Sequence, residues 1–314
     1  MSRFLIFLGR HAMTAMVAGV FIGLLVPPLA TLLRPMLAAA VWALLVISLL
    51  RVDLAQGVMH LGRPFRLLVI LVLFMVAMPV GMQALTSVTD LPPGVAGAMV
   101  LTAGSSVLIS TPTIGLLMGL DGAMILLIML GSTLLVPLTM PSVALLLLGM
   151  QLDVSTWELM GRLAALVGSG VLVAVICRRI WAPQVARISR QLDGGAVIVL
   201  IIFALAIMDG MTARLLANPA FVLFVTAISF AVYTGLLIAT VGVLAIITPR
   251  WGRKVILSVG LSAGCRNLGV ILAVLPTGSD PDMLLYFAAG QFPIYIMPAV
   301  LRPVMLRLVA KKPI

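Results

Sequence analysis

The sequence predicts an all-α polytopic membrane protein. Hydrophobic residues make up 63% of the chain and charged residues only 9%, and the mean hydropathy is +1.28. A soluble domain carries about 25% charged residues, so no water-soluble core takes up this much apolar sequence. The two cysteines, Cys177 and Cys265, lie far apart in apolar segments, and this spacing indicates neither a disulfide framework nor a metal site.

The apolar segments predict ten membrane-spanning helices. A transmembrane helix needs about 20 apolar residues. Segments of roughly this length fall at 12–31, 36–51, 67–86, 94–119, 122–149, 160–180, 195–215, 219–247, 255–276 and 283–304. The fifth and eighth are long, and Pro137 and Pro141 lie inside the fifth, which predicts a tilt or a kink.

The basic residues predict the orientation in the membrane. Most of the 20 Lys and Arg residues fall in one set of loops, which includes both terminal segments, whereas the opposite loops hold only Arg34, Arg162 and Arg214. Loops rich in Lys and Arg face the cytoplasm, so we expect both termini on that side. The net charge of +11 is then a topology signal and not a nucleic-acid-binding surface. We expect a bacterial inner membrane, and nothing in the sequence specifies an oligomeric state.

The order of the spans predicts an internal duplication within a single membrane domain, residues 1–314. Five spans precede the polar loop near residue 152 and five follow it, which gives repeats at about 1–152 and 153–314. Tandem duplication of an odd number of spans inverts the second copy, and inverted repeats are a hallmark of secondary transporters. The segments TPTIGLL (111–117) and CRNLGVI (265–271) both lie in the fourth span of their half.

Arg266 is the most informative residue of the chain, because it lies inside the ninth span. A charged residue at the centre of a membrane helix costs about 2.5–3.5 kcal/mol and marks a functional site by default. Gly264 before it, and Asn267 and Gly269 after it, predict a helix break, with Asn267 as a possible cap.

Thr111-Pro112-Thr113 predicts a matching break in the fourth span, with Thr111 as the cap of a new half-helix. If the two breaks cross, free carbonyl groups meet near the membrane midplane and stabilise a cation, which Arg266 would supply permanently. The alternative is a pair of ordinary kinked helices, with the Arg266 side chain extended to the membrane interface.

Three stretches resemble the bile acid:sodium symporter family, within the wider group that includes arsenite permeases and auxin-type efflux carriers. They are LLRVDLAQGVMHLGRPFRLLVILVLFMVAMPV (49–80), LISTPTIGLLMGLDGAMILLIMLGSTLLVPLTMP (108–141) and GCRNLGVILA (264–273). The resemblance implies ten helices, a core domain with crossed broken helices four and nine, and a panel domain of helices one, two, six and seven. It also implies alternating access and the uptake of an organic anion together with sodium.

The chain departs from this family at the positions implied to bind sodium. Ser262 stands where the family has a glutamate, Arg266 where it has a glutamine, and Thr111-Pro112 where it has Ser-Asn. Ser132 and Thr133 match and stay candidates for residual sodium ligands, whereas other implied polar positions are Phe74, Ile125 and Met129. Hard cations require several oxygen ligands, and a fixed positive charge repels them. We therefore expect sodium coupling at these sites to be lost or strongly altered.

These observations favour a secondary active transporter of a small organic anion, bile-acid-like or another carboxylate, with no cofactor. An arginine is able to pair such an anion through two parallel hydrogen bonds. The candidate substrate-binding residues are Thr111, Pro112, Thr113, Ser262, Cys265, Arg266 and Asn267.

Several alternatives stay open. A thiolate at Cys265 would suit metalloid efflux, as in arsenite permeases, and a channel or a receptor has the same fold-level appearance. Asp209, near Arg214, is either an interfacial ion pair or a proton-coupling group. We do not expect an enzyme, because the chain has no HExxH motif, no carboxylate pair in facing spans and no histidine at membrane depth.

Overall fold

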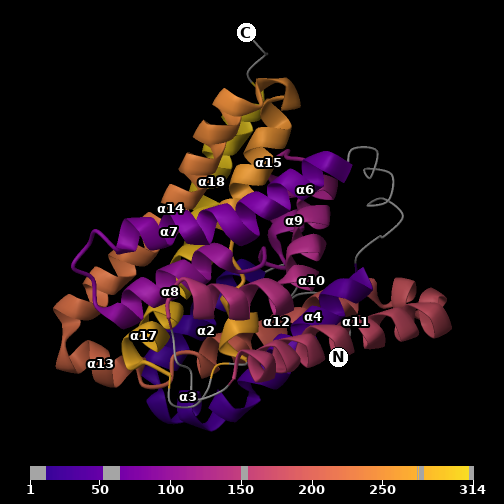
Figure 1. The fold of residues 1–314 in the computed structure, drawn as a ribbon. Coiled ribbons are helices and arrows are strands. Elements are labelled where there is room, and N and C mark those ends of the chain that lie inside the picture. Colours follow the sequence, from indigo (N-terminus) through magenta and orange to yellow (C-terminus); the bar gives the residue numbers. More distant parts are fainter. Residues whose placement is uncertain (1–11, 52–63, 150–154, 274, 276–278, 311–314) are drawn as a thin grey trace. The chain divides into compact units, whose positions relative to one another are not determined.

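A computed structural model describes residues 12–51, 64–149, 155–273, 275 and 279–310 (Figure 1). These residues are overwhelmingly helical and contain no β-strand, only one isolated β-bridge. Seven helical segments are long and apolar enough to cross a membrane, which confirms an all-α polytopic membrane protein. They are Pro27–Leu50, Pro64–Thr86, Gly122–Leu146, Thr156–Val185, Gln191–Ala217, Pro219–Ile247 and Pro281–Ala310.

Helix interruptions explain why seven segments, and not ten, meet this criterion. The segment 219–247 is one uninterrupted helix, α14 (Pro219–Ile247). The segment 12–31 is divided at Pro27. The segment 195–215 is also divided, at Gly210, whose φ of 77° favours glycine, but it still belongs to the candidate span Gln191–Ala217. The segments 94–119 and 255–276 are each divided into two short helices, and part of the latter lies outside the described residues. The divided segments contain the helices α2 (Ala12–Leu25), α3 (Pro27–Leu33), α8 (Pro93–Gly104), α9 (Thr111–Leu117), α12 (Ser189–Ala206), α13 (Met211–Ala217), α15 (Arg253–Gly264) and α16 (Leu268–Leu272).

The chain divides into two compact units. Unit 1 comprises Met1–Val52, Gly161–Phe224 and Gly269–Leu275, and unit 2 comprises Asp53–Met160, Val225–Leu268 and Pro276–Ile314.

The remaining helices are η1 (Arg34–Met36), α4 (Leu37–Arg51), α6 (Pro64–Val72), the π-helical turn η3 (Leu73–Ala77), α7 (Met78–Thr86), α10 (Gly122–Leu146), α11 (Thr156–Arg187), η4 (Pro249–Trp251), α17 (Pro281–Ala289) and α18 (Gln291–Ala310).

Unit 1 is built around α12, which packs against α2, α3 and α4. A hydrogen bond of 3.0 Å from Trp42 Nε1 to Ser169 Oγ joins α4 to α11. The helix α11 bends at Trp181, whose backbone is not helical, two residues before Pro183.

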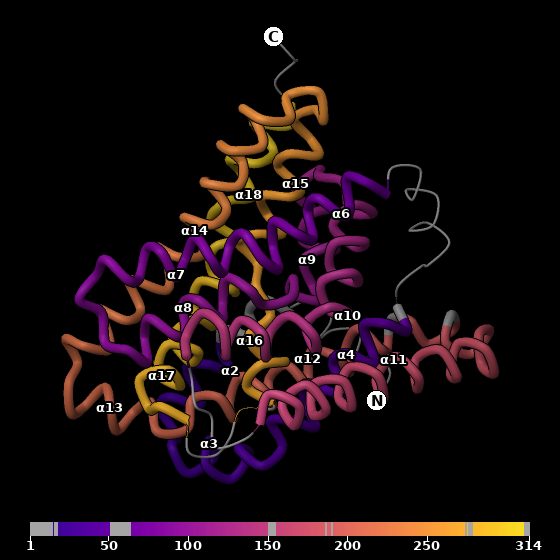
Figure 2. Tube along the Cα trace, in the orientation of Figure 1, coloured from indigo at the N-terminus to yellow at the C-terminus, as the bar shows by residue number. Residues whose placement is uncertain are grey.

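Unit 2 holds the two interrupted helices. α8 packs against α7 and α17, and α10 packs against α8, α9 and α15 (Figure 2). α15 runs antiparallel to α14 at very short range: a Cβ atom on Gly264 would lie 2.9 Å from the carbonyl oxygen of Tyr233, and one on Gly260 would lie 3.3 Å from that of Leu237. Glycine at both positions permits this approach of two backbones.

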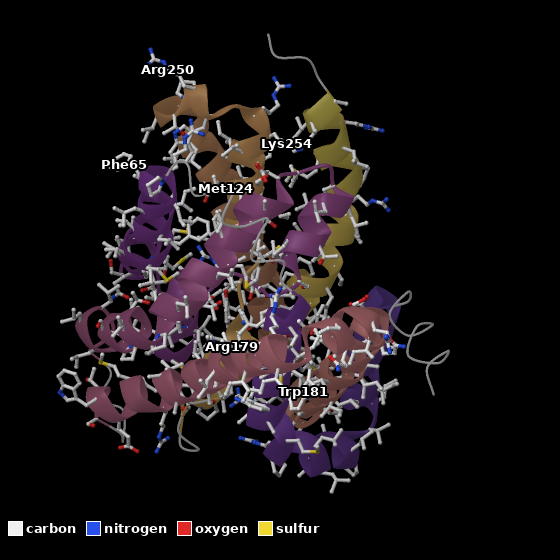
Figure 3. All side chains as sticks on the ribbon, turned by 90° about the vertical axis from the view of Figure 1, so that its right-hand side faces the viewer. Phe65, Met124, Arg179, Trp181, Arg250 and Lys254 are labelled. Carbon is white, nitrogen blue, oxygen red and sulfur yellow. The ribbon has the colours of Figure 1, made fainter. Side chains whose placement is uncertain are left out.

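The helices of unit 2 begin at two different ends. Figure 3 shows Arg250 and Lys254 at the same end as Phe65, the second residue of α6. The guanidinium of Arg66 lies 5.5 Å from the ring centroid of Trp251 there. α8 and α17 begin together elsewhere, because a Cβ on Gly94 would lie 2.2 Å from Asp280 Oδ1. The chain from α8 returns to the first end, where the Asp121 amide donates to Ser258 Oγ at 2.9 Å.

Candidate functional site

The first interruption separates α8 from α9. α8 ends at Gly104, and its C-cap Ser105 is extended, with ψ of 164°. α9 begins at Thr111, its N-cap is Ser110, and Pro112 lies in its first turn. The predicted break is confirmed, but the cap position is wrong by one residue: Thr111 is already helical and makes no capping hydrogen bond. Proline at this place is favourable because the first-turn N–H groups need no helical partner.

The second interruption separates α15 from α16. α15 ends at Gly264, Cys265 is its C-cap with φ of −113° and ψ of 87°, and α16 begins at Leu268. Asn267 lies immediately before the new helix, as the sequence predicts for a cap, and it is buried. The alternative of two merely kinked helices is therefore wrong for both spans.

The two interruptions cross and pair through their backbones. Val107 and Arg266 form an antiparallel β-bridge. The Leu108 amide donates to the Cys265 carbonyl at 2.9 Å, and the Asn267 amide donates to the Ser106 carbonyl at 2.8 Å. These bonds satisfy backbone groups that lose their helical partners at the breaks, which a buried site requires.

Arg266 lies at this crossing with an exposed fraction of 0%. Its Nε donates to the carbonyl of Ala263 at 2.9 Å, and its Nη1 donates to the carbonyl of Ser105 at 2.8 Å. These two carbonyls belong to the C-terminal ends of α15 and α8 respectively. Because the C-terminal end of a helix carries partial negative charge, both half-helices stabilise the guanidinium.

The π-helical turn η3 and the residue after it complete the surroundings of Arg266. The guanidinium carbon lies 4.3 Å from the ring centroid of Phe74, a cation–π contact, and Nη2 donates to Met78 Sδ. Pro79 accounts for the wider turn, because a proline has no N–H and its ring crowds the carbonyl four residues earlier, at Met75. Turns of this kind occur often at functional sites.

The guanidinium has no carboxylate partner among the residues that the structure describes. Arginine has five N–H donors, and the three contacts with Ala263, Ser105 and Met78 engage three of them. The site therefore holds a buried positive charge that carbonyl dipoles and an aromatic ring compensate only in part, and two donors are left for a further acceptor.

The other predicted substrate-binding residues lie along the same two breaks in different surroundings. Ser262 is buried and donates to the Ser258 carbonyl at 2.9 Å within α15. The Ser106 hydroxyl is buried and has no hydrogen-bond partner among the described residues, whereas Thr111 is buried, Pro112 is intermediate and Thr113 is exposed. Cys265 packs in an apolar cluster with Met118, Leu120, Ile125, Leu237, Leu257, Leu261 and Met305.

Ser132 supports the first interruption. Its hydroxyl accepts a hydrogen bond of 3.1 Å from the Val107 amide and donates to the Met129 carbonyl at 3.1 Å. Thr133 donates to the same Met129 carbonyl at 2.7 Å. Ser132 thus stabilises the backbone beside Arg266. Within the described parts of the chain, no group of three His, Cys, Asp or Glu side chains is arranged to hold a metal ion.

Asp209 lies in unit 1 and forms an ion pair. Its Oδ2 accepts from Arg34 Nη1 at 2.6 Å and its Oδ1 accepts from Thr31 Oγ1 at 2.7 Å. Closeness in the sequence suggested Arg214 as the ion-pair partner of Asp209. The observed ion pair instead joins Asp209 to Arg34, 175 residues away in the sequence. The Arg34 side chain is 52% exposed and that of Asp209 15%, which fits the interfacial alternative.

Sequence reasoning did not predict that four residues contact Arg266: Phe74, Met78, Ser105 and Ala263. Two of them act through backbone carbonyls, which no side-chain pattern reveals. The Met78-Pro79 pair was a usable signal, because a proline inside an apolar span predicts a local distortion. Comparison with known protein families and with curated proteins found no match for this chain.

Proposed function

We propose that this protein is a secondary active transporter of a small organic anion, in which Arg266 is a permanent cation at the crossing of two interrupted helices. The observation that carries the proposal is the pair of hydrogen bonds from Arg266 to the carbonyls of Ser105 and Ala263. A charge buried in an apolar protein without a carboxylate partner is costly, and such charges usually serve function. Interrupted helices that meet end to end are typical of transporter substrate and ion sites.

The course of the helices in unit 2 supports an inverted repeat of ten crossings in total. α8 and α15 have 12 residues each, and each is followed by a break and a shorter helix. The long helices α10 and α18 follow the two breaks. α6 and α15 begin at one end of the unit, whereas α8 and α17 begin together elsewhere. The corresponding helices α8 and α15 therefore run in opposite directions.

The division of the chain supports the core and panel arrangement that the bile acid:sodium symporter resemblance implies. Unit 1 draws most of its helices from 12–51 and 161–224, which correspond to predicted spans one, two, six and seven, and it also includes Gly269–Leu275 from the end of the ninth span. Unit 2 holds predicted spans three, four, five, eight and ten, and both interruptions. Two compact units built from alternate parts of each half suit alternating access, in which one body moves against the other.

Arg266 makes a bound sodium ion at the crossing unfavourable. The carbonyl groups that would attract a cation already accept from the guanidinium, and Ser132 already accepts from the Val107 amide. A second positive charge a few ångströms away is repelled strongly in a medium of low dielectric constant. We therefore propose transport that does not depend on sodium at this site.

The distribution of basic residues supports a cytoplasmic position for the end of unit 2 that carries Arg250 and Lys254 (Figure 3). Both termini would then be cytoplasmic, in a bacterial inner membrane. Metalloid efflux gains no support from the site, because Cys265 lies among apolar side chains and soft centres bind several thiolates. Replacing Cys265 with serine would leave transport intact under the present proposal.

The test uses purified protein in detergent and then in vesicles. A thermal-stability screen of potassium salts of organic anions selects the anion that stabilises the protein most, and uptake of that labelled anion is then measured in sodium-free vesicles. We expect Arg266→Gln to reduce uptake at least tenfold. Arg250→Gln is the control, since it also removes one positive charge but from an exposed residue. Equal uptake by wild type and Arg266→Gln would refute the proposal.

A further inference from the structure

Met78 differs from the other groups that surround Arg266. Ser105, Ala263 and Phe74 each have an exposed fraction of 0%, as does Arg266 itself, whereas Met78 is only partly buried. The other described contacts of the guanidinium are therefore fully buried. Among the described residues that contact the guanidinium, Met78 is the one whose side chain is not fully buried.

Met78 also offers the weakest acceptor of the site. A thioether sulfur accepts hydrogen bonds only weakly, and methionine is flexible, with three rotatable side-chain bonds. A carboxylate would make stronger, charge-assisted hydrogen bonds to the same nitrogen, and its two oxygens match the planar fork of a guanidinium. The exchange of a thioether for a carboxylate is therefore favourable at Arg266.

We propose that the carboxylate of the transported anion displaces the Met78 thioether from Arg266, so that residue 78 sets the affinity and selectivity of the anion site. This inference rests on the proposed function, because it assumes that the anion binds at Arg266. It explains how a fully buried guanidinium receives a ligand: one flexible side chain moves, while the two carbonyls and the Phe74 ring keep Arg266 in place. The Nη2 donor that Met78 releases then binds one carboxylate oxygen, and the two unused N–H donors of Arg266 are available to the other carboxylate oxygen.

The proposal predicts a preference for planar carboxylates over spherical anions. A halide is a single spherical acceptor, whereas a carboxylate offers two oxygens whose spacing matches that of two guanidinium nitrogens. Acetate is therefore a suitable probe, and chloride is a suitable reference at equal ionic strength.

The experiment measures thermal unfolding of the full-length protein in detergent while potassium acetate replaces potassium chloride. Met78→Leu keeps a side chain of similar volume but removes the sulfur, and Met78→Ala removes most of the side chain that contacts Arg266. Met75→Leu is the matched control, because Met75 lies in the π-helical turn just before Met78 but its sulfur accepts from Thr139 Oγ1 at 3.6 Å and not from Arg266. We expect the acetate midpoint to fall about three- to tenfold in Met78→Leu, given the modest net strength of the displaced hydrogen bond, and to stay unchanged in Met75→Leu.

The outcomes separate the two proposals. In one outcome, Arg266→Gln abolishes the acetate response, and wild type, Met78→Leu and Met78→Ala share one acetate midpoint. This outcome would overturn the role of Met78 but leave the anion site at Arg266 standing. An acetate response that persists unchanged in Arg266→Gln would overturn both. No acetate response in wild type or in either Met78 variant would overturn the displacement, while the organic-anion screen decides the proposed function separately. If one of the two Met78 variants does not fold, the other variant still tests the proposal.

Discussion

Arg266 Nη1 donates a 2.8 Å hydrogen bond to the carbonyl of Ser105, a residue 161 positions earlier in the chain. Ser105 is the C-cap of α8, and Arg266 follows the C-cap of α15. One side chain thus joins the C-terminal ends of two helices whose partial negative charges would otherwise face each other. The guanidinium neutralises these ends, and this pairing links the stability of the crossing to the charge at residue 266.

The charge and the geometry of Arg266 are both expected to contribute to stability. Arg266→Gln removes the charge and leaves the carbonyls of Ser105 and Ala263 without strong donors, so the free energy of unfolding should fall by about 2–3 kcal/mol. Arg266→Lys keeps the charge but reaches fewer acceptors, and an intermediate loss is expected. Thermal unfolding in detergent measures both, with Arg250→Gln as the control that should change little. A ranking with lysine below glutamine would contradict a role for the charge.

Ser132 is expected to stabilise the first interruption more than its neighbour Thr133 does. Ser132→Ala leaves the buried Val107 amide without its acceptor, at a cost of about 1–3 kcal/mol. Thr133→Val removes only a hydrogen bond to a carbonyl of its own helix, and the loss should be smaller. Comparing the unfolding temperatures of the two variants checks this order. Equal losses would mean that the Ser132–Val107 bond contributes nothing specific.

The close approach of α14 and α15 depends on Gly264. In Gly264→Ala the new Cβ would lie 2.9 Å from both the Tyr233 carbonyl oxygen and Leu237 Cβ, so the helices must separate. We expect a loss of about 1–3 kcal/mol, together with lower transport because Arg266 lies two residues away. Gly235→Ala in α14 is the control, since no atom lies within 4 Å of the added methyl group. A Gly264→Ala protein as stable as the control would show that the two helices tolerate a wider spacing.

Asp209 is expected to be dispensable for coupling. Asp209→Asn weakens the ion pair with Arg34 but keeps an acceptor for Thr31, so stability should fall by only about 0–1 kcal/mol. Uptake into sodium-free vesicles should respond to an imposed pH gradient in the same way in wild type and variant. A response to the gradient that is present in wild type and lost in Asp209→Asn would instead identify Asp209 as a proton-coupling residue.

The sequence was sufficient to predict the membrane class, the two interruptions and the central residue. Composition alone indicates a bilayer, and a glycine, an arginine and an asparagine in succession inside one span indicate a break. The segment 219–247 was predicted to the residue because it contains no proline after its first position and no charge. The conclusion that Arg266 supplies the cation for two helix ends followed from the same residues.

The partners of Arg266 and Asp209 were not predictable, because they are set by packing between distant segments. Ser105 and Ala263 act through backbone carbonyls, which every residue possesses. Phe74 contacts Arg266 from a π-helical turn and Met78 from the residue that follows it, and an apolar pattern does not distinguish that turn from an ordinary helix. Asp209 pairs with Arg34, which is distant in the sequence, because η1 packs against α12 in unit 1. Predicted helix ends also shifted where a proline or a glycine begins a new helix, as at Pro27 and Gly210.

The most direct test of the account is the thermal stability of the purified wild-type protein in sodium against potassium at constant ionic strength. An ion that binds only the folded state raises the unfolding temperature by mass action. Because Arg266 already neutralises the carbonyl ends of α8 and α15, we predict superimposable unfolding curves in the two salts up to high concentration. A rise in unfolding temperature specific to sodium would show that a sodium site persists and would contradict the assignment of Arg266 as the permanent cation.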